Sequence, residues 1–225
     1  MDFAARFWHC EGVSNLPLSK FIAQYNRWCS KAGYYGSDSK AAEIHALACC
    51  QVPSLPYNET TKRLVEQAVE QLNTLAATLA SLQLEMQRLV SALPEYPVVL
   101  AMYGVGKVLG PQLIAEIGDV RRFPKKESLV AFAGVDAPPF QSGTFESANR
   151  SISKRGAPGL RKALFQVMAA ILQNSPAEDA VFQFLCRKRS EGKHYYTYMV
   201  AGCNKFLRIY YARVREYLNN LDAVA

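Results

Sequence analysis

The sequence is poor in the residues that build zinc sites. It has three histidines, far apart, and six cysteines of which no two have C-x-x-C spacing. Structural zinc sites need clusters of these residues, so none is expected, and the cysteines are better explained as free thiols in a reducing cytoplasm. The sequence also lacks an apolar run of the roughly 18 residues that a membrane span needs, and a signal-peptide pattern. We therefore expect a soluble, cytoplasmic protein without a membrane partner.

The positive charge is concentrated in the second half of the chain. Residues 1–103 contain 8 Lys/Arg against 9 Asp/Glu, whereas residues 104–225 contain 18 against 10, which accounts for the whole net charge of +7. Such asymmetry favours a polyanionic partner, most simply nucleic acid, although many basic domains bind nothing of the kind. With 50% hydrophobic residues, the 225-residue chain can bury a core in one or two domains.

Residues 58–93 carry the clearest periodicity. Apolar residues recur there at alternating steps of three and four over four heptads, which is the a and d pattern of a coiled coil. The pattern predicts a long helix that pairs with a second helix, within the chain or between two copies; packing inside a bundle of its own chain is the alternative. This leucine stripe comprises Val65, Ala68, Leu72, Leu75, Leu79, Leu82, Met86, Leu89 and Leu93.

Glycines mark a possible hairpin within residues 98–118. Two short apolar helices are predicted there, joined at Gly104-Val105-Gly106, and the pattern resembles a helix-hairpin-helix element. Gly104 and Gly106 would let the backbone approach a phosphate, while Lys107 and the amides at the start of the second helix would attract it. Such a grip is independent of base sequence. An ordinary helix–helix turn is the alternative, and a dinucleotide fingerprint or a P-loop is disfavoured because neither spacing fits.

Residues 134–158 are rich in proline and glycine and are predicted to be mostly loop. They include Ser142, and a serine can attack a phosphate when its proton is removed and cations stabilise the pentavalent phosphorus. Most loop serines are only turn residues or hydrogen-bonding groups. Lys193 follows the basic segment Arg187-Lys188-Arg189. Its charge is either solvated or in contact with a phosphate. The other candidate phosphate contacts are Arg150, Lys154, Arg155, Arg161 and Lys162.

Several short motifs follow one another in a specific order in the basic half. This ordered set, which spans about residues 94–218, resembles the C-terminal domain of the IS110-type insertion-sequence transposases. That family includes the Piv DNA invertases and the bridge-RNA-guided recombinases. The motifs are Tyr103-Gly104-Val105-Gly106, Ala115-Glu116-Ile117-Gly118-Asp119, Arg122-Phe123, Ala131-Phe132-Ala133-Gly134-Val135, Gln141-Ser142-Gly143, Ser153-Lys154-Arg155-Gly156, Leu160-Arg161 and the tail from Gly192-Lys193-His194 to Lys205-Phe206-Leu207.

The resemblance implies a DNA transposase or site-specific recombinase of the insertion-sequence type. In such enzymes an N-terminal RuvC-like domain with an RNase H fold holds Mg²⁺ on four acidic residues. A coiled coil joins it to a C-terminal domain whose serine is the nucleophile, and that position is Ser142 here. The resemblance also implies DNA as substrate, a partner subunit, and in some members a structured guide RNA.

The N-terminal region departs from the family pattern. Ser37-Asp38-Ser39-Lys40-Ala41-Ala42 resembles the last acidic motif, but Ala41 stands where a second aspartate is expected, and the segment before it is too short for the strands that carry the first two acids. Asp38 would remain as the one metal ligand, and a single carboxylate does not hold Mg²⁺ in octahedral geometry. This chain alone is therefore not expected to bind Mg²⁺ or to be active.

We thus expect a mainly α protein. It would contain a truncated α/β remnant of the RuvC-like domain over 1–57, a coiled-coil linker over 58–93 that makes a homo-oligomer, and a C-terminal domain over 94–225 with the helix-hairpin-helix at 98–118. Helices are predicted within the C-terminal domain over 159–174 and 195–218. A non-enzymatic, dimeric DNA- or RNA-binding module is the alternative to a recombinase.

Overall fold

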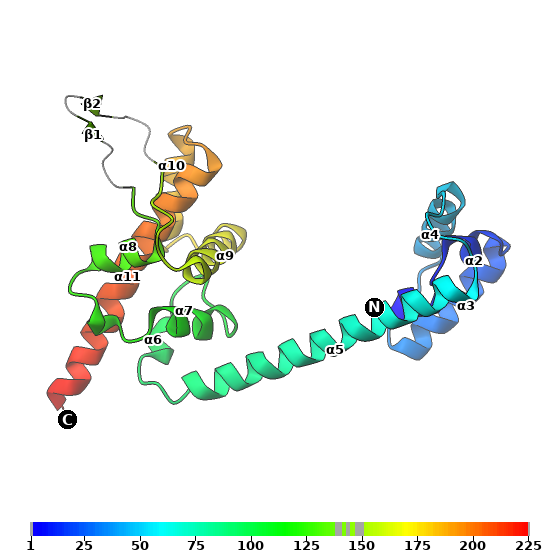
Figure 1. Ribbon diagram of the computed structural model, residues 1–225, viewed down its shortest axis with the longest axis horizontal. Helices are drawn as coiled ribbons and strands as arrows, with labels where there is room; N and C mark the ends of the chain where they lie inside the picture. The colour runs from blue at the N-terminus through cyan, green and yellow to red at the C-terminus, as the bar shows by residue number, and fades with distance from the viewer. Residues whose placement is uncertain (1, 138–140, 143–144, 147–150, 225) are drawn as a thin grey trace. The chain divides into compact units, whose positions relative to one another are not determined.

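The computed structural model describes residues 2–137, 141–142, 145–146 and 151–224. The described chain is mainly helical, as predicted, and it divides into two units, Met1–Leu82 and Gln83–Ala225 (Figure 1). In the part of the chain that the structure describes, no helix is long and apolar enough to cross a membrane. All six cysteines are free thiols.

Unit 1 is a small helical cluster around an aromatic core. On α3, residues Phe21, Tyr25 and Cys29 follow one another every four positions, so they share one side of the helix and are buried together. Around them, the rings of Phe7 and Trp28 meet edge-on at 5.9 Å between centroids. The helices of this unit are α1 (Asp2–Arg6), α2 (Cys10–Ser14), α3 (Leu18–Ala32), α4 (Asp38–Cys50) and the first part of α5 (Glu59–Val90).

The expected α/β remnant over residues 1–57 is not confirmed, because residues 2–57 form helices and irregular segments without a strand. The physical reason lies in the apolar spacing. A half-buried strand alternates apolar and polar residues, whereas the buried residues of α3 recur every fourth position. Gly33, in the left-handed conformation with φ +75°, ends α3 as glycine commonly does.

Most of the leucine stripe is uncovered along α5. Leu72, Leu75, Leu79 and Leu82 are each more than half exposed. Within unit 1, the described residues therefore leave this segment of the stripe largely open. Pairing of α5 with a second copy remains a prediction.

Unit 2 is built on two long helices, α9 (Pro158–Asn174) and α11 (Tyr195–Val224), and α9 packs against both α7 (Leu109–Ile117) and α11 (Figure 1). Large side chains at helical spacing fill the space between them, and each one buried contributes roughly 1.5–3 kcal/mol. The fully buried ones on these two helices include Leu160, Leu164, Met168, Ile171, Met199, Phe206 and Tyr210.

The remaining elements of unit 2 surround this pair. A short antiparallel ribbon lies within the segment between α8 and α9, with Gln141 opposite Glu146 and Ser142 opposite Phe145. The elements are α6 (Tyr96–Leu100), a 3-10 helix (Val120–Arg122), α8 (Lys126–Ala133), β1 (Gln141–Ser142), β2 (Phe145–Glu146) and α10 (Ala180–Ser190).

Candidate nucleic-acid interface

The predicted hairpin exists as α6, a turn and α7, and the surroundings of Gly104 and Gly106 within it differ. Gly104 has φ +76°, and a Cβ there would lie 2.6 Å from Ile171 Cγ1 and 2.7 Å from Val167 O. This glycine therefore lets the turn lie directly on α9. Gly106 is exposed, and a Cβ there would meet nothing within 4 Å. The helix-hairpin-helix grip is not confirmed by this geometry.

Lys107 is exposed and lines a hollow of about 400 Å³ beside α7. Glu116 lines the same hollow, so its lining carries one cation and one carboxylate. The Glu116 carboxylate also lies directly against Gly159 in the first turn of α9, where an added Cβ would overlap Oε1. The negative charge of this carboxylate interacts favourably with the positive N-terminal end of α9. The same charge weakens the attraction of the hollow for a phosphate.

The basic turn Ser153–Gly156 is fixed by the backbone at the end of α8. The amide of Ser153 donates to Asp136 O at 2.9 Å, and the amide of Lys154 donates to Gly134 O at 3.1 Å. Gly134 and Gly156 approach so closely that a Cβ on Gly134 would lie 2.8 Å from the Gly156 nitrogen. Lys154 adopts the left-handed conformation with φ +53°, which is unfavourable for a residue with a Cβ and is held here by these contacts.

A groove of about 1170 Å³ lies between this turn, α9 and the start of α11. Its described lining brings together Lys154, Arg161 and Lys162 and includes no carboxylate. Two neighbouring tyrosines at the start of α11, Tyr195 and Tyr196, form part of the same lining. Such a combination of cations and exposed aromatic rings is typical of surfaces that bind nucleic acid.

The cations of the groove differ in how free they are. Arg161 is half-buried, and its Nη1 donates to Ala133 O at 3.0 Å, so one of its five donors caps the end of α8. Lys154 and Lys162 are exposed. Among the cations of the groove, these two lysines are therefore the most accessible to a polyanion that approaches from solvent.

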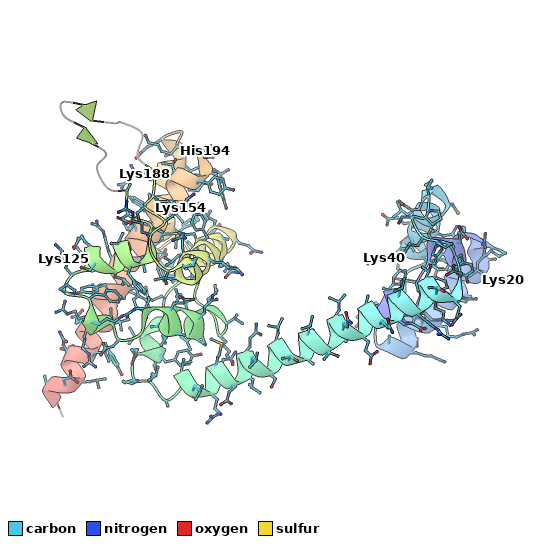
Figure 2. All side chains as sticks on the ribbon, in the orientation of Figure 1. Lys20, Lys40, Lys125, Lys154, Lys188 and His194 are labelled. Atoms are coloured by element: carbon cyan, nitrogen blue, oxygen red, sulfur yellow. The ribbon has the colours of Figure 1, made fainter. Side chains whose placement is uncertain are left out.

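The other predicted phosphate contacts are not gathered in this groove. Arg155 and Lys193 are exposed and do not belong to its described lining. Arg150 lies outside the described residues. Figure 2 labels Lys154 together with Lys188, in the last turn of α10, and His194, just beyond this helix.

The basic end of α10 is partly neutralised. Glu191 receives a hydrogen bond from Lys188 at 2.7 Å and lies 4.0 Å from Arg187. The Lys188 hydrogen bond is the main cause that lowers the pKa of Glu191. Lys205 lies over the Phe184 ring at 4.9 Å, a cation–π contact. Two cations of this end, Arg187 and Lys188, and Lys205 of α11 thus already have partners in the chain.

The backbone of Ser142 lies in β1, in the part of the chain between Ala137 and Ile152, here called the Ser142 segment. Ala137 and Ile152 both line the groove. The side chain of Ser142 lies outside what the structure describes. Its role as a nucleophile stays a prediction.

Asp38 has a structural role in unit 1. Its Oδ1 accepts a hydrogen bond from Asn26 Nδ2 at 2.6 Å, and it lies in the first turn of α4, where a carboxylate is favourable. Ser37 caps the same helix and accepts from the amide of Lys40 at 3.3 Å. Nowhere in residues 2–137, 141–142, 145–146 and 151–224 do three or more His, Cys, Asp or Glu side chains form a cluster suited to a metal ion.

The residues that sequence reasoning missed are Tyr195 and Tyr196. The available signal was their position directly after Gly192-Lys193-His194, because adjacent tyrosines beside a basic segment are typical of nucleic-acid contacts. We expected only an amphipathic helix from residue 195. The start of this helix and Lys154 line the same groove because of tertiary packing, and local sequence patterns do not reveal such packing.

Comparison with known proteins confirms the family resemblance. Residues 96–183 match the model described as "Transposase IS116/IS110/IS902 family". The chain is 29% identical over 143 residues to the "Pilin gene-inverting protein" of Moraxella bovis, an alignment that covers 62% of this chain and 44% of that protein. The pilin gene-inverting protein of Moraxella lacunata gives the same identity and coverage.

A third relative is the "Insertion element IS110 uncharacterized 43.6 kDa protein" of Streptomyces coelicolor. It is 24% identical over 166 residues, which cover 74% of this chain and 40% of the relative. The chain thus spans less than half the length of these curated relatives.

Proposed function

With the match of residues 96–183 to the IS116/IS110/IS902 transposases as the premise, we propose that this chain takes part in cutting and rejoining DNA. Ser142 is the proposed nucleophile. The groove lined by Lys154, Arg161 and Lys162 is the proposed site of contact with the DNA backbone. Substrate, activity and partners are all parts of this proposal.

The observation that carries the proposal is the position of the cationic groove at the base of the Ser142 segment. Both ends of that segment, Ala137 and Ile152, belong to the lining that also contains three cations and no described carboxylate. Cations that no carboxylate of the described lining neutralises attract phosphates, and phosphates release their counterions on binding. A DNA strand bound here would pass the segment that carries the hydroxyl.

The proposed reaction is a transesterification. The Ser142 Oγ forms a bond to a backbone phosphorus while a sugar oxygen leaves the same phosphorus and takes up a proton; the serine proton is released to the surroundings. The phosphoserine link conserves the energy of the broken phosphodiester. A sugar hydroxyl of another strand then forms a bond to the phosphorus and gives up its proton, while the Ser142 Oγ leaves the same phosphorus, takes up a proton and is regenerated as a hydroxyl. Arg161, with donors still free among its described contacts, suits the stabilisation of charge on the phosphorus.

Mg²⁺ is implied by the family, but the described residues do not fit it. Asp38 is the one predicted ligand that is present, and its carboxylate already accepts from Asn26 and lies in the first turn of α4. Mg²⁺ needs near-octahedral oxygen ligation, which one carboxylate of this kind does not organise. If the metal acts, its carboxylates come from another chain or from a longer form of this protein, and no step of the proposal depends on it.

Two copies are proposed to pair through the leucine stripe of α5. The exposed Leu72, Leu75, Leu79 and Leu82 supply a continuous apolar seam at a and d spacing. Residues 71–84 contain no charged side chain, so the pairing would depend on apolar contact rather than on ion pairs. Such a dimer would bring two Ser142 segments into one assembly.

The decisive test uses a nicked suicide DNA that releases a short fragment when a protein–DNA bond forms. The incomplete acidic site argues against complete strand exchange by this chain alone, but attack by Ser142 on a suicide DNA includes no step through the metal. The proposal therefore predicts a covalent adduct with the wild-type chain, with and without added Mg²⁺ as separate arms, and its loss in Ser142→Ala. Ser190→Ala, an exposed serine of the same unit, is the matched control and should retain the adduct. Absence of an adduct under every condition would remove the nucleophile from the proposal.

A non-enzymatic, dimeric nucleic-acid-binding module is the second candidate. It is favoured by the structural role of Asp38, whose carboxylate is held by Asn26 rather than standing free for a metal. This candidate predicts salt-dependent binding without an adduct. Affinities for duplex DNA and for a hairpin RNA, measured side by side, separate its DNA and RNA forms; weak binding to both would discard it.

A further inference from the structure

The two tyrosines at the start of α11 form an aromatic platform with a fixed base. Tyr198 is buried in the core, and Tyr195 meets it edge-on at 5.4 Å between centroids. Tyr196 meets Tyr195 edge-on at 5.3 Å and also lies 5.8 Å from the His194 ring. Tyr196 is 64% exposed even so. The platform is therefore held from below, while Tyr195, which is 46% exposed, and Tyr196 both keep surface open to solvent.

Cations lie in the same groove as this platform. Lys154 is held in a strained backbone conformation by the end of α8, and Lys162 is carried by the first turns of α9. The groove measures about 1170 Å³, which exceeds the roughly 300–1,000 Å³ typical of pockets for small ligands. A groove of this size along α9 and the start of α11 can hold a short stretch of a polymeric ligand.

We infer that this groove binds unpaired DNA nucleotides, with bases stacked on Tyr195 and Tyr196 and phosphates at Lys154 and Lys162. The inference rests on the proposed function. A duplex hides the faces of its bases, so it would gain only the charge contacts, whereas an unpaired strand offers a base face to each exposed ring. Strand exchange at a broken phosphodiester supplies such unpaired nucleotides beside the Ser142 segment.

The lining also explains why binding would be tolerant of base identity. Apart from its cations, the groove offers mainly apolar and aromatic surface, including Phe165 and Val200. Gln166, Thr197 and Asn204 also line it, and Asn204 Nδ2 already donates to Val135 O at 2.8 Å. Every base has a face that stacks, so stacking discriminates weakly. Recognition of a specific target sequence would therefore have to involve groups outside this groove.

The test is fluorescence anisotropy with a labelled ten-nucleotide oligo-dT, a duplex of the same length and an oligo-U. Tyr196→Ala is expected to weaken oligo-dT binding by about 5- to 150-fold, the loss of one base–aromatic stack, while duplex binding and the salt slope for oligo-dT stay unchanged. Tyr196→Trp should restore binding. Tyr35→Ala, a fully exposed tyrosine of unit 1, is the matched control and should have no effect.

The outcomes separate this inference from the proposed function. If the wild type binds duplex in a salt-dependent way, and Tyr196→Ala leaves oligo-dT affinity unchanged, the stacking platform is wrong and the cationic groove survives. If oligo-U is preferred over oligo-dT by tenfold or more, the groove serves RNA and the DNA form is overturned. Loss of both oligo-dT and duplex binding in Tyr196→Ala contradicts a specific stacking role. A wild type that binds none of the three probes overturns both proposals.

Discussion

Gly104 lies where the turn after α6 crosses α9, and its role is packing. A Cβ would lie 2.6 Å from Ile171 Cγ1 and 2.7 Å from the Val167 carbonyl oxygen, in a backbone conformation with φ +76°. Neither neighbour is the flexible end of a long side chain. Overpacking and a left-handed non-glycine residue both raise the free energy of the folded state.

Gly104→Ala is therefore expected to lower the free energy of unfolding by about 1–3 kcal/mol. Gly106→Ala is the matched control, because Gly106 has open space around it and is not among the glycines with positive φ; it should be neutral or stabilise by about 0.4–1 kcal/mol. Urea unfolding followed by circular dichroism measures both. Equal stability of the two variants would contradict the packing role of Gly104.

The same pair of variants examines the original hairpin hypothesis. If Gly106 brings the backbone close to a phosphate, Gly106→Ala weakens DNA binding although the protein is as stable as the wild type. In the structure an added Cβ at Gly106 meets nothing within 4 Å, so the affinity of Gly106→Ala for DNA is expected to equal that of the wild type. Anisotropy with duplex DNA at low salt is a sufficient measurement.

At the scale of the element, α5 combines a long helix with an uncovered apolar seam. Leu79 belongs to the leucine stripe and is 59% exposed, whereas Leu84 lies off the stripe and is 69% exposed. The two leucines are thus similar in exposure and differ in their place on the helix. This contrast allows pairing through the stripe to be separated from general hydrophobic association.

Leu79→Lys is expected to convert a dimer into a monomer, because a charge at a central a position cannot be buried against a second helix without a partner. Leu84→Lys should remain dimeric. Sedimentation equilibrium over a range of protein concentrations measures the association constant. A wild type that stays monomeric at the highest concentration, or equal effects of both substitutions, would contradict the pairing.

Local patterns were sufficient to predict the long helices. The segment predicted over 159–174 became α9 at Pro158–Asn174, and α11 begins at Tyr195 as predicted, although it continues to Val224 instead of ending near 218. The α/β remnant came from a likeness around Asp38, not from strand periodicity, and residues 2–57 contain no strand. The role of Gly104 and the meeting of Lys154 with Tyr196 depend on contacts between residues far apart in sequence. Single-sequence patterns do not contain that information.

At the scale of the whole molecule, the core of unit 2 contains acidic groups that ionise with difficulty. Burial raises the pKa of the Cys203 thiol to about 12 and raises the pKa of the Tyr210 hydroxyl as well. In the unfolded chain these groups ionise near their ordinary pKa values of about 8.5 and 10. Between the unfolded and folded pKa values, the unfolded state therefore binds fewer protons than the folded state.

Below a pH of about 8.5, the free energy of unfolding of unit 2 should therefore contain the whole contribution of these two buried groups. It should decrease progressively as the pH rises toward 12. Cys203→Ala should start this decline at higher pH, although its cavity lowers stability at every pH. Urea unfolding of the wild type and the variant at several alkaline pH values measures the slopes. A wild-type stability that is constant from pH 8 to 11 would contradict the burial of these ionisable groups.

The central claim concerns the cationic groove at the base of the Ser142 segment, and the salt dependence of DNA binding tests it most directly. The double variant Lys154→Gln/Lys162→Gln should reduce the slope of log K against log salt by about 2 with duplex DNA, because each neutralised phosphate contributes about 0.9. The control Lys20→Gln/Lys40→Gln changes two exposed lysines of unit 1 and should leave the slope unchanged (Figure 2). Equal slopes for the wild type and the groove variant would contradict the claim.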